Sequence, residues 1–536
     1  MLHYIQRSPL DKVYGEAAKR GEEFSFSRAM IGEEIHYQIA IWSDSDRPEI
    51  VQFKDCSAIF KRIYIAKNVP VAFAHYSDDK DPNYLSDDCA MIPDCLIPIS
   101  PLDTITIGNT PTLIWVTVYS NIPGEYAVDF EFTTEEQALT THFTLKVINH
   151  LLPKKINLLR CAISPHSIAE QGNFPLYSNV FWEHLEEHFK VAKRHGITDI
   201  ITPLFSSEES RHLNRSPDQL IKIREVNREY EYHYDQLDSW IMLANRCGIK
   251  NFTFQAIFPS MKRKKCPLVY GERFKHPYLI FSDEDDMLSD RFFTFLKDFL
   301  KKLNQHLQEL DVNINIPYLI TDEIDENSVE LYKDCVYKIK RALNGQNITY
   351  KLRNPDLFDL TNSPTPVVSI ADIEPFSNMP YGPYLYFDSD SSRGIANQLI
   401  ASPSVRMRAL GFLCYKYEVS GVMLYQYNSN ISPLTYKRFN SLLSPDGEGS
   451  VPAGSTFMVY NELNGPWPSI RLLMLRSALQ DATALQILQG YVDRADIIKM
   501  IDQEFLVTAN QYSINEDNFT KLHNRIYDLL EKYTND

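Results

Sequence analysis

The stretch NVFWEHLEEHFKVAKRHGITDIITPLF, residues 179–205, contains the two patterns that decide the fold. In its first part, apolar residues recur at spacings of three and four, which is the pattern of an amphipathic helix. In its second part, TDIITPLF is a short apolar run of the kind that forms a buried strand. A helix followed by a buried strand is one unit of a parallel sheet that helices cover. These residues therefore predict an α/β domain.

The same alternation continues on both sides of this unit, with helical stretches such as residues 290–310 between short apolar runs. Eight such runs are candidate strands: INLLRCAI (156–163), TDIITPLF (198–205), NFTFQAIF (251–258), NINIPYLIT (313–321), NITYKL (347–352), PVVSI (366–370), PYLYFD (383–388) and GVMLYQY (421–427). Eight strands alternating with helices predict a (β/α)8 TIM barrel over residues 151–490, closed by a helix at 469–489.

The first 150 residues show a different pattern. Short β segments occur at residues 34–43, 110–120, 124–134 and 141–150, separated by turn residues. In EYAVDFEF, residues 125–132, apolar and polar residues alternate with period two, as a half-buried antiparallel strand requires. Residues 1–150 are therefore expected to form an N-terminal β-sandwich, and residues 491–536 a C-terminal helical extension.

Composition excludes several classes of partner. The 536 residues carry a formal charge of -16, which repels phosphate backbones and anionic lipid, so neither nucleic acid nor a membrane surface is an expected partner. A neutral or cationic substrate fits better. The N-terminus lacks the apolar region of a signal peptide, and no apolar run is long enough to span a bilayer, which predicts a cytoplasmic protein.

The chain also lacks the common signatures of bound cofactors and metals. Its eight cysteines are scattered, and no cluster has the spacing of a zinc site, so we expect neither disulfides nor a structural metal. Serine-hydrolase, zinc-protease, P-loop and dinucleotide-binding motifs are absent. No cofactor is expected.

The candidate catalytic residues are Asp322 and Glu323, in the segment TDEIDE (321–326) directly after the fourth strand. Adjacent acids such as Glu22-Glu23 and Glu186-Glu187 occur elsewhere, where a solvated surface is the simpler interpretation. Position distinguishes Asp322 and Glu323, because the active sites of such barrels lie at the C-terminal ends of the strands. A carboxyl group at a partly dehydrated rim can have the raised pKa of a general acid.

The adjacency of Asp322 and Glu323 favours one kind of glycosidase mechanism. Most glycosidases place two carboxylates on either side of the bond to be cleaved. Neighbouring acids suit substrate assistance better, in which the 2-acetamido oxygen of the sugar attacks its own anomeric carbon. One carboxylate then orients the acetamido nitrogen and the other protonates the leaving oxygen.

Aromatic and amide side chains near strand ends are candidate substrate-binding residues, because sugar rings stack on aromatic faces. Barrel packing is the alternative for each of them, and at Trp240, on a predicted helix, we favour packing. Tyr232 and Tyr234 belong to the same helix-like stretch after the second strand. The candidates for substrate binding are Tyr384, Tyr386, Tyr425, Tyr427, Asn428 and Tyr234.

Several of these segments resemble one family in the correct order along most of the chain. They are PDCLIP (93–98), LIWVTV (113–118), PGEY (123–126), GITDIITPLF (196–205), TDE (321–323), RMRALGFLCYKYEVSGVMLYQYN (406–428) and VPAGSTFMVYNELNGPWPSIRLLMLRSALQDATAL (451–485). The set is similar to glycoside hydrolase family 123 and the families grouped with it as domain of unknown function 4091. The resemblance implies a retaining β-N-acetylgalactosaminidase, in which Asp322 polarises the acetamido group and Glu323 is the acid/base.

Some positions depart from the pattern of that family. Tyr425 stands where its members commonly carry Trp, and Ala256 and Met261 stand where they often carry His and Trp. The usually Pro-rich segment after the second strand is SSEESR, residues 206–211. Two alternatives therefore stay open: a carbohydrate-binding barrel without turnover, and a two-carboxylate glycosidase of altered sugar specificity that pairs Glu323 with an acid such as Asp388.

Overall fold

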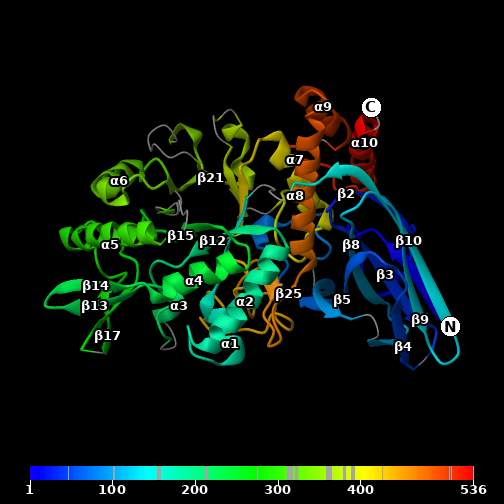
Figure 1. The fold of residues 1–536 in the computed structure, drawn as a ribbon, viewed down its shortest axis with the longest axis horizontal. Helices are drawn as coiled ribbons and strands as arrows, with labels where there is room; N and C mark the ends of the chain where they lie inside the picture. Colours follow the sequence, from blue (N-terminus) through cyan, green and yellow to red (C-terminus); the bar gives the residue numbers. More distant parts are fainter. Residues whose placement is uncertain are drawn as a thin grey trace.

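The computed structural model shows an N-terminal pair of sheets beside a larger part made of a parallel sheet and helices (Figure 1). It describes Met1 to Thr534 apart from residues 46, 88, 101–102, 154–157, 212–214, 275, 311–317, 320–323, 358–364, 378, 380–381, 388–392, 425, 506 and 509. Among the described residues, no helix combines the length and the apolar character that crossing a membrane requires.

Two five-stranded sheets make up the N-terminal part. One has the order β1 (Leu2–Arg7), β3 (Ile35–Ser43), β8 (Thr112–Tyr119), β5 (Phe60–Val71), β6 (Ala90–Ile99). The other has the order β2 (Phe26–Ile31), β10 (Ala138–Leu151), β9 (Gly124–Thr133), β4 (Glu49–Asp55), β7 (Thr104–Ile107). The sheets share one apolar core, in which the rings of Tyr37 and Phe143 stack 4.1 Å apart. The alternation in β9 buries Val128, Phe130 and Phe132 there, as the sequence predicted.

Each of the eight predicted strands of the larger part contributes to one curled sheet in which all pairings are parallel. Its order is β19 (Ile348–Thr349), β18 (Tyr318–Leu319), β15 (Asn251–Phe254), β12 (Ile197–Thr202), β11 (Leu158–Ala162), β23 (Gly421–Leu424), β22 (Tyr384–Tyr386), β21 (Val367–Ser369), β20 (Lys351–Leu352). The first and last strands in this order are separated in the chain by Tyr350 alone.

Helices cover the outside of this sheet (Figure 1). They are α2 (Asn179–Arg194), α4 (Asp235–Arg246), α5 (Asp290–Glu309), α6 (Val329–Leu343), α7 (Ser404–Lys416) and α8 (Ile470–Leu488), whereas the shorter α1 (Pro165–Gly172) and α3 (Glu208–Arg211) lie in the loops after β11 and β12. Helix α2 begins where the Ser178 hydroxyl accepts a hydrogen bond from the Phe181 amide, and it buries its apolar stripe on the sheet. Helix α8 is buried on nearly all sides, and a side chain at Gly411 of α7 would collide with the Ala478 carbonyl of α8.

A second, four-stranded sheet was not predicted. Its order is β14 (Glu229–His233), β13 (Lys222–Val226), β16 (Val269–Arg273), β17 (His276–Phe281). The helix-like interpretation of Tyr232 was wrong, because EYEYHY alternates with period two and a tight turn at Asn227 and Arg228, both with positive φ, pairs the two strands. Trp240 lies in α4 and is fully buried against Phe189, so the packing prediction for it is confirmed.

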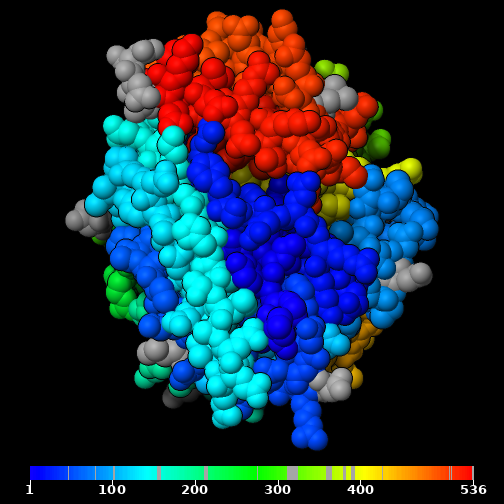
Figure 2. Space-filling view, turned by 90° about the vertical axis from the view of Figure 1, so that its right-hand side faces the viewer, coloured from blue at the N-terminus to red at the C-terminus, as the bar shows by residue number. Residues whose placement is uncertain are grey.

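The C-terminal segment packs on the N-terminal sheets. It contains α9 (Arg494–Glu504) and α10 (Glu516–Thr534), and Figure 2 shows it, in red, lying against the blue and cyan strands. In α10, Asp528 pairs with Arg28 of β2, Glu531 pairs with Lys146 of β10, and the Leu530 carbonyl accepts a hydrogen bond from His150. The C-terminal helices therefore connect the two parts of the molecule.

A buried ionic cluster fixes the two parts to each other. Asp94 of β6 has no exposed surface and accepts hydrogen bonds from Arg471 of α8, at 2.9 Å, and from the Tyr460 hydroxyl, at 2.7 Å. Lys12 lies 3.9 Å from the same carboxylate. Tyr460 is in the short hairpin of β24 (Val459–Tyr460) and β25 (Trp467–Pro468). Short 3-10 helices at 15–19, 77–79, 355–357, 370–372 and 374–376 complete the described elements.

Candidate functional site

The predicted catalytic acids fall, in the sequence, between two described residues that pair within the parallel sheet. Asp322 and Glu323 lie outside the described residues, as do Tyr425 and Asp388. The chain on both sides of the two acids is part of the sheet: Leu319 pairs with Thr349, and Ile324 pairs with Leu352. Between these two pairs, the segment that contains the acids is two residues longer than its partner strand.

The inside of the curled sheet carries a buried ion pair. Arg160 of β11 donates from Nε to Asp199 of β12 at 2.8 Å, and the Thr253 hydroxyl of β15 donates to the same carboxylate at 3.1 Å. Burial lowers the pKa of the Arg160 guanidinium, but Asp199 and Tyr384 together outweigh it and raise that pKa above its ordinary value. The pair links three neighbouring strands from within, which makes this part of the sheet rigid.

Tyr384 and Tyr386 lie inside the curled sheet rather than on its rim. Both belong to β22, are almost fully buried, and pack with Ile201, Val367 and Met423. The guanidinium of Arg160 lies 4.3 Å from the centre of the Tyr384 ring, and the ammonium of Lys351 lies 4.7 Å from the centre of the Tyr386 ring. Tyr386 is the last residue of its strand, so it is the nearer of the two tyrosines to the strand ends.

Tyr427 and Asn428 follow β23 and hold loops together. The Tyr427 side chain is fully buried on the helix side of the sheet, with its ring edge-on to His188 of α2. The Asn428 amide oxygen accepts from the Ser164 N–H at 2.8 Å, and its nitrogen donates to the Ser164 carbonyl at 3.3 Å. These contacts give both residues a structural role, and Tyr427 faces away from the inside of the sheet.

A cluster of buried and half-buried polar side chains after the first two strands was missed from the sequence. The Ser210 hydroxyl donates to Asp218 at 2.7 Å and lies 3.0 Å from Nε2 of His166. The Ser164 hydroxyl donates to Glu209 at 3.4 Å. Burial, with the nearby Asp218 carboxylate, raises the pKa of Glu209 to about 7. A carboxyl group with this pKa can donate or accept a proton near neutral pH, as a general acid or base requires.

The one sequence signal for this cluster was the SSEESR segment, residues 206–211, which departs from the family pattern and contains Glu209 and Ser210. Arg215 ties the cluster to its surroundings: it pairs with Glu170 of α1 and donates to the Tyr436 carbonyl in the loop after β23 at 3.0 Å. The loops after the first, second and eighth strands therefore meet around Glu209.

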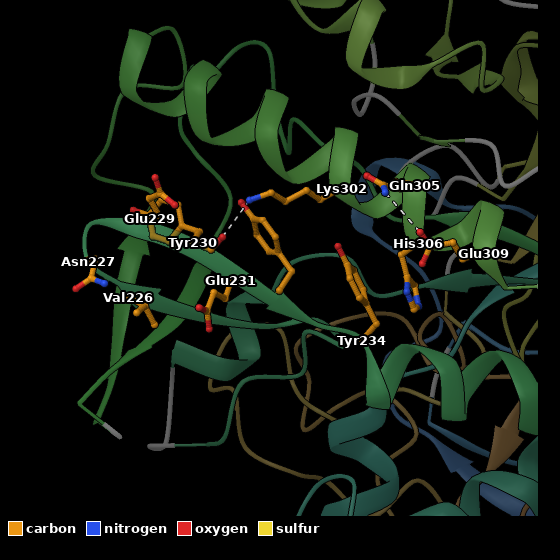
Figure 3. Close-up of a pocket in the computed structure, with 11 residues that line it drawn as sticks. Val226, Asn227, Glu229, Tyr230, Glu231, Tyr234, Lys302, Gln305, His306 and Glu309 are labelled. Carbon is orange, nitrogen blue, oxygen red and sulfur yellow. Dashed lines mark hydrogen bonds between the residues drawn. The ribbon is translucent and has the colours of Figure 1, made fainter.

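Tyr234, the remaining predicted substrate-binding residue, lines a cavity of about 480 Å³ between the β13–β14 hairpin and α5 (Figure 3). Its ring stacks on His306 of α5 at 4.0 Å, and none of the residues lining the cavity belongs to the parallel sheet. The structure therefore separates Tyr234 from the other candidates. Among the described residues, no cluster of His, Cys, Asp and Glu could hold a metal ion.

Comparison with known proteins identifies the family whose architecture this chain shares. The model of the catalytic domain of glycoside hydrolase family 123 matches residues 163–488. A family 123 glycoside hydrolase from Clostridium perfringens, whose structural analysis addresses glycolipid glycan hydrolysis, covers 99% of each chain with a TM-score of 0.75 and 16% identity. At this identity the likeness concerns the fold.

Two further solved structures are similar only at TM-scores too low to carry an argument. They are a β-glucuronidase from Parabacteroides merdae (TM-score 0.31, 10% identity, 87% of this chain and 51% of that one) and an endo-β-1,4-mannanase from Thermotoga petrophila (TM-score 0.38, 11% identity, 64% and 78%). No curated protein sequence matches the chain.

The fold and the family match define the class of the protein as a glycoside hydrolase, whose substrates are carbohydrates. The chain belongs to glycoside hydrolase family 123.

Proposed function

We propose that this protein is a retaining exo-β-N-acetylhexosaminidase, similar to a β-N-acetylgalactosaminidase, which hydrolyses terminal β-linked 2-acetamido sugars. The family match over residues 163–488 carries the proposal, because it includes Asp322 and Glu323 in the segment expected to hold the catalytic acids. The pairing of Leu319 and Ile324 within the parallel sheet supports it, since it attaches the segment to a rigid element.

The proposed architecture is a closed (β/α)8 barrel. The sheet order begins at Ile348–Thr349 and ends at Lys351–Leu352, so a single extended segment around Tyr350 pairs on one side with β18 and on the other with β21. The proposed domains are the β-sandwich at 1–150, the catalytic barrel at 151–490 and the helical extension at 491–536.

In the proposed mechanism, Asp322 accepts a hydrogen bond from the acetamido N–H, and Glu323 begins protonated. The acetamido oxygen attacks the anomeric carbon while the bond to the leaving oxygen breaks, and Glu323 gives its proton to that oxygen. Asp322 stabilises the positive charge of the resulting oxazolinium ion. Glu323 then removes a proton from water, which attacks the anomeric carbon from the face that the leaving group occupied. The bond from this carbon to the acetamido oxygen breaks as the new bond forms, so the acetamido group is restored and the β-configuration is retained.

We propose that Tyr425, two residues beyond Met423, and Tyr386 contribute to the wall that holds the sugar. In the sequence, Tyr425 directly follows β23 and Tyr386 is the last residue of β22, and these two strands pair with each other. The buried Arg160–Asp199 pair and Asn428 act through positioning, because they hold the strands and loops around this wall.

Hydrolysis of aryl β-GalNAc and aryl β-GlcNAc substrates tests the proposal. We expect Glu323→Gln to lower kcat/KM by about 10²–10⁴, the usual contribution of one general acid/base. Glu326→Gln, an exposed acid in the same segment, is the matched control and should retain activity. Equal activity of the wild type and Glu323→Gln would refute the proposal.

An inhibitor separates the proposed mechanism from the two-carboxylate alternative. A thiazoline analogue of the acetamido sugar resembles the cyclic intermediate and should bind more tightly than the substrate. Covalent labelling by a fluorosugar without an acetamido group, together with no thiazoline inhibition, would instead indicate a nucleophile such as Asp388. Glycan binding without hydrolysis would indicate a binding protein.

A further inference from the structure

The cavity between the β13–β14 hairpin and α5 has the size and the walls of a ligand site. Its volume, about 480 Å³, lies within the usual range for small-molecule pockets. In Figure 3, Lys302, Gln305, His306 and Glu309 follow one another along α5 on one side, and Tyr230 comes from the hairpin opposite. The cavity is therefore built from two elements outside the parallel sheet.

The chemistry of the walls excludes an anion and favours a polar ligand. Three carboxylates, Glu229, Glu231 and Glu309, line the cavity in a chain of charge -16, so an anion is repelled. Lys302 offsets part of this negative charge, and Val226 is the single aliphatic side chain among the lining residues. Tyrosine rings beside carboxylate and amide oxygens are the combination that sugar rings and their hydroxyl groups use.

One buried polar group in the cavity has no partner. The Tyr234 hydroxyl is inaccessible to solvent and makes no hydrogen bond to any described residue. The Tyr234 ring is fixed by the stack on His306, whose Nε2 lies 2.7 Å from Asp238, so Tyr234 forms a rigid part of the cavity wall.

The edge of β14 supplies backbone groups to the same cavity. β14 is the outer strand of its sheet, and the tight turn makes Val226 and Glu229 the closing pair of the hairpin. Because bonded and non-bonded pairs alternate along the ladder, the backbone groups of Tyr230 and Tyr232 face the open edge. The Tyr230 carbonyl accepts a hydrogen bond from Lys302 at 3.2 Å, in agreement with this orientation.

We propose that this cavity is a second carbohydrate-binding site, which holds a neutral saccharide between the edge of β14 and the C-terminal half of α5. The saccharide hydroxyls bond to Gln305 and to the glutamates that line the cavity. The site holds glycan beside the catalytic domain and performs no reaction. It does not depend on Asp322 or Glu323.

Lactose is a suitable probe, because it is neutral and lacks the acetamido group that the proposed reaction requires. Its binding to the full chain is measured by saturation-transfer NMR and calorimetry. Gln305→Trp places a large ring in the cavity from an exposed helix position and should abolish binding. Gln308→Trp, an exposed position on the same helix that does not line the cavity, is the matched control and should bind like the wild type.

No lactose binding by the wild type, or equal binding by the wild type and Gln305→Trp, would overturn the proposal. Hydrolysis of the aryl substrates is measured on the same proteins. If the wild type binds lactose but does not hydrolyse the aryl substrates, the catalytic proposal is refuted and the proposal of a second binding site is not.

Discussion

Glu33 is a carboxylic acid enclosed at the contact between the N-terminal sheets and α10. Its side chain accepts hydrogen bonds from the Met30 amide, at 2.7 Å, and from the Tyr527 hydroxyl. Burial raises the pKa of Glu33 to about 7 from an ordinary value of 4.5. Between these two values the folded protein binds a proton that the unfolded chain has lost, so its stability falls as the pH rises through this range.

Glu33→Gln should remove this loss, because an amide keeps the shape of the acid and cannot ionise. Each unit of pKa shift is worth about 1.4 kcal/mol. The difference in the free energy of unfolding between the variant and the wild type should therefore increase in favour of the variant, by on the order of 3 kcal/mol, as the pH rises from 5 to 8. Urea titrations of both proteins at several pH values measure the difference. A difference that does not change with pH would contradict the prediction. Glu209 and Glu516 have similarly raised pKa values in both proteins, so their contributions cancel.

At the scale of the elements, the stability of the curled sheet depends on the buried ion pair between Arg160 and Asp199. Removing one partner of a buried pair leaves an uncompensated charge, which typically costs 3–5 kcal/mol. Asp199→Asn should therefore lower the free energy of unfolding by about 3 kcal/mol, measured by urea denaturation, since Arg160 would keep its charge between β11 and β12.

The double variant Arg160→Met with Asp199→Leu is the control for this prediction. It removes both charges and fills a similar volume, so most of the lost stability should return. A double variant as unstable as Asp199→Asn would show that packing, rather than the unpaired charge, causes the loss.

The sequence predicted elements well wherever one period extended over enough residues. The eight strands were located from short, mainly apolar runs, and the helices α2 and α5 from apolar residues at spacings of three and four. The four-stranded sheet was missed because β13 and β14 are five residues each and lie between a loop and a helix. Tyr427 was assigned to the sugar wall from its place near a strand end, but which face a side chain occupies depends on where the strand stops.

Only part of the candidate site could be predicted from the sequence. The position of Asp322 and Glu323 directly after the fourth predicted strand pointed to them from the sequence alone, and their adjacency favoured substrate assistance. Glu209, in contrast, resembles other acidic surface pairs. Its environment comes from Ser164, which is distant in the sequence, and from Arg215 and Asp218, which the loop after α3 brings back to it. Such an environment is set by tertiary contacts that no local pattern records.

At the scale of the whole molecule, the two parts should unfold together. Asp94 carries the negative charge that both Arg471 and Lys12 contact inside the protein. Asp94→Asn would remove this charge and leave the two buried cations without it. We expect a single thermal transition in the wild type and in the variant, with the free energy of unfolding lowered by about 3 kcal/mol. Calorimetry measures the number of transitions.

Asp528→Asn is the matched control, because Asp528 also links the two parts but is largely exposed. Exposed ion pairs contribute about 0–1 kcal/mol, so this variant should be close to the wild type. Separate transitions for the N-terminal sheets and the remainder in the wild type would contradict the prediction of joint unfolding.

The contact between Asn428 and Ser164 has a consequence for motion. It clamps the loop after β23 to the start of α1, and the Asn430 amide adds a bond to the Ser167 hydroxyl at 3.1 Å. These two loops can open only as one body, so the amide protons of Ser164 and Asn430 should exchange with solvent at the same slow rate. In the proposed function this side of the rim stays fixed, so adjustment to the shape of a sugar belongs to the other loops of the rim.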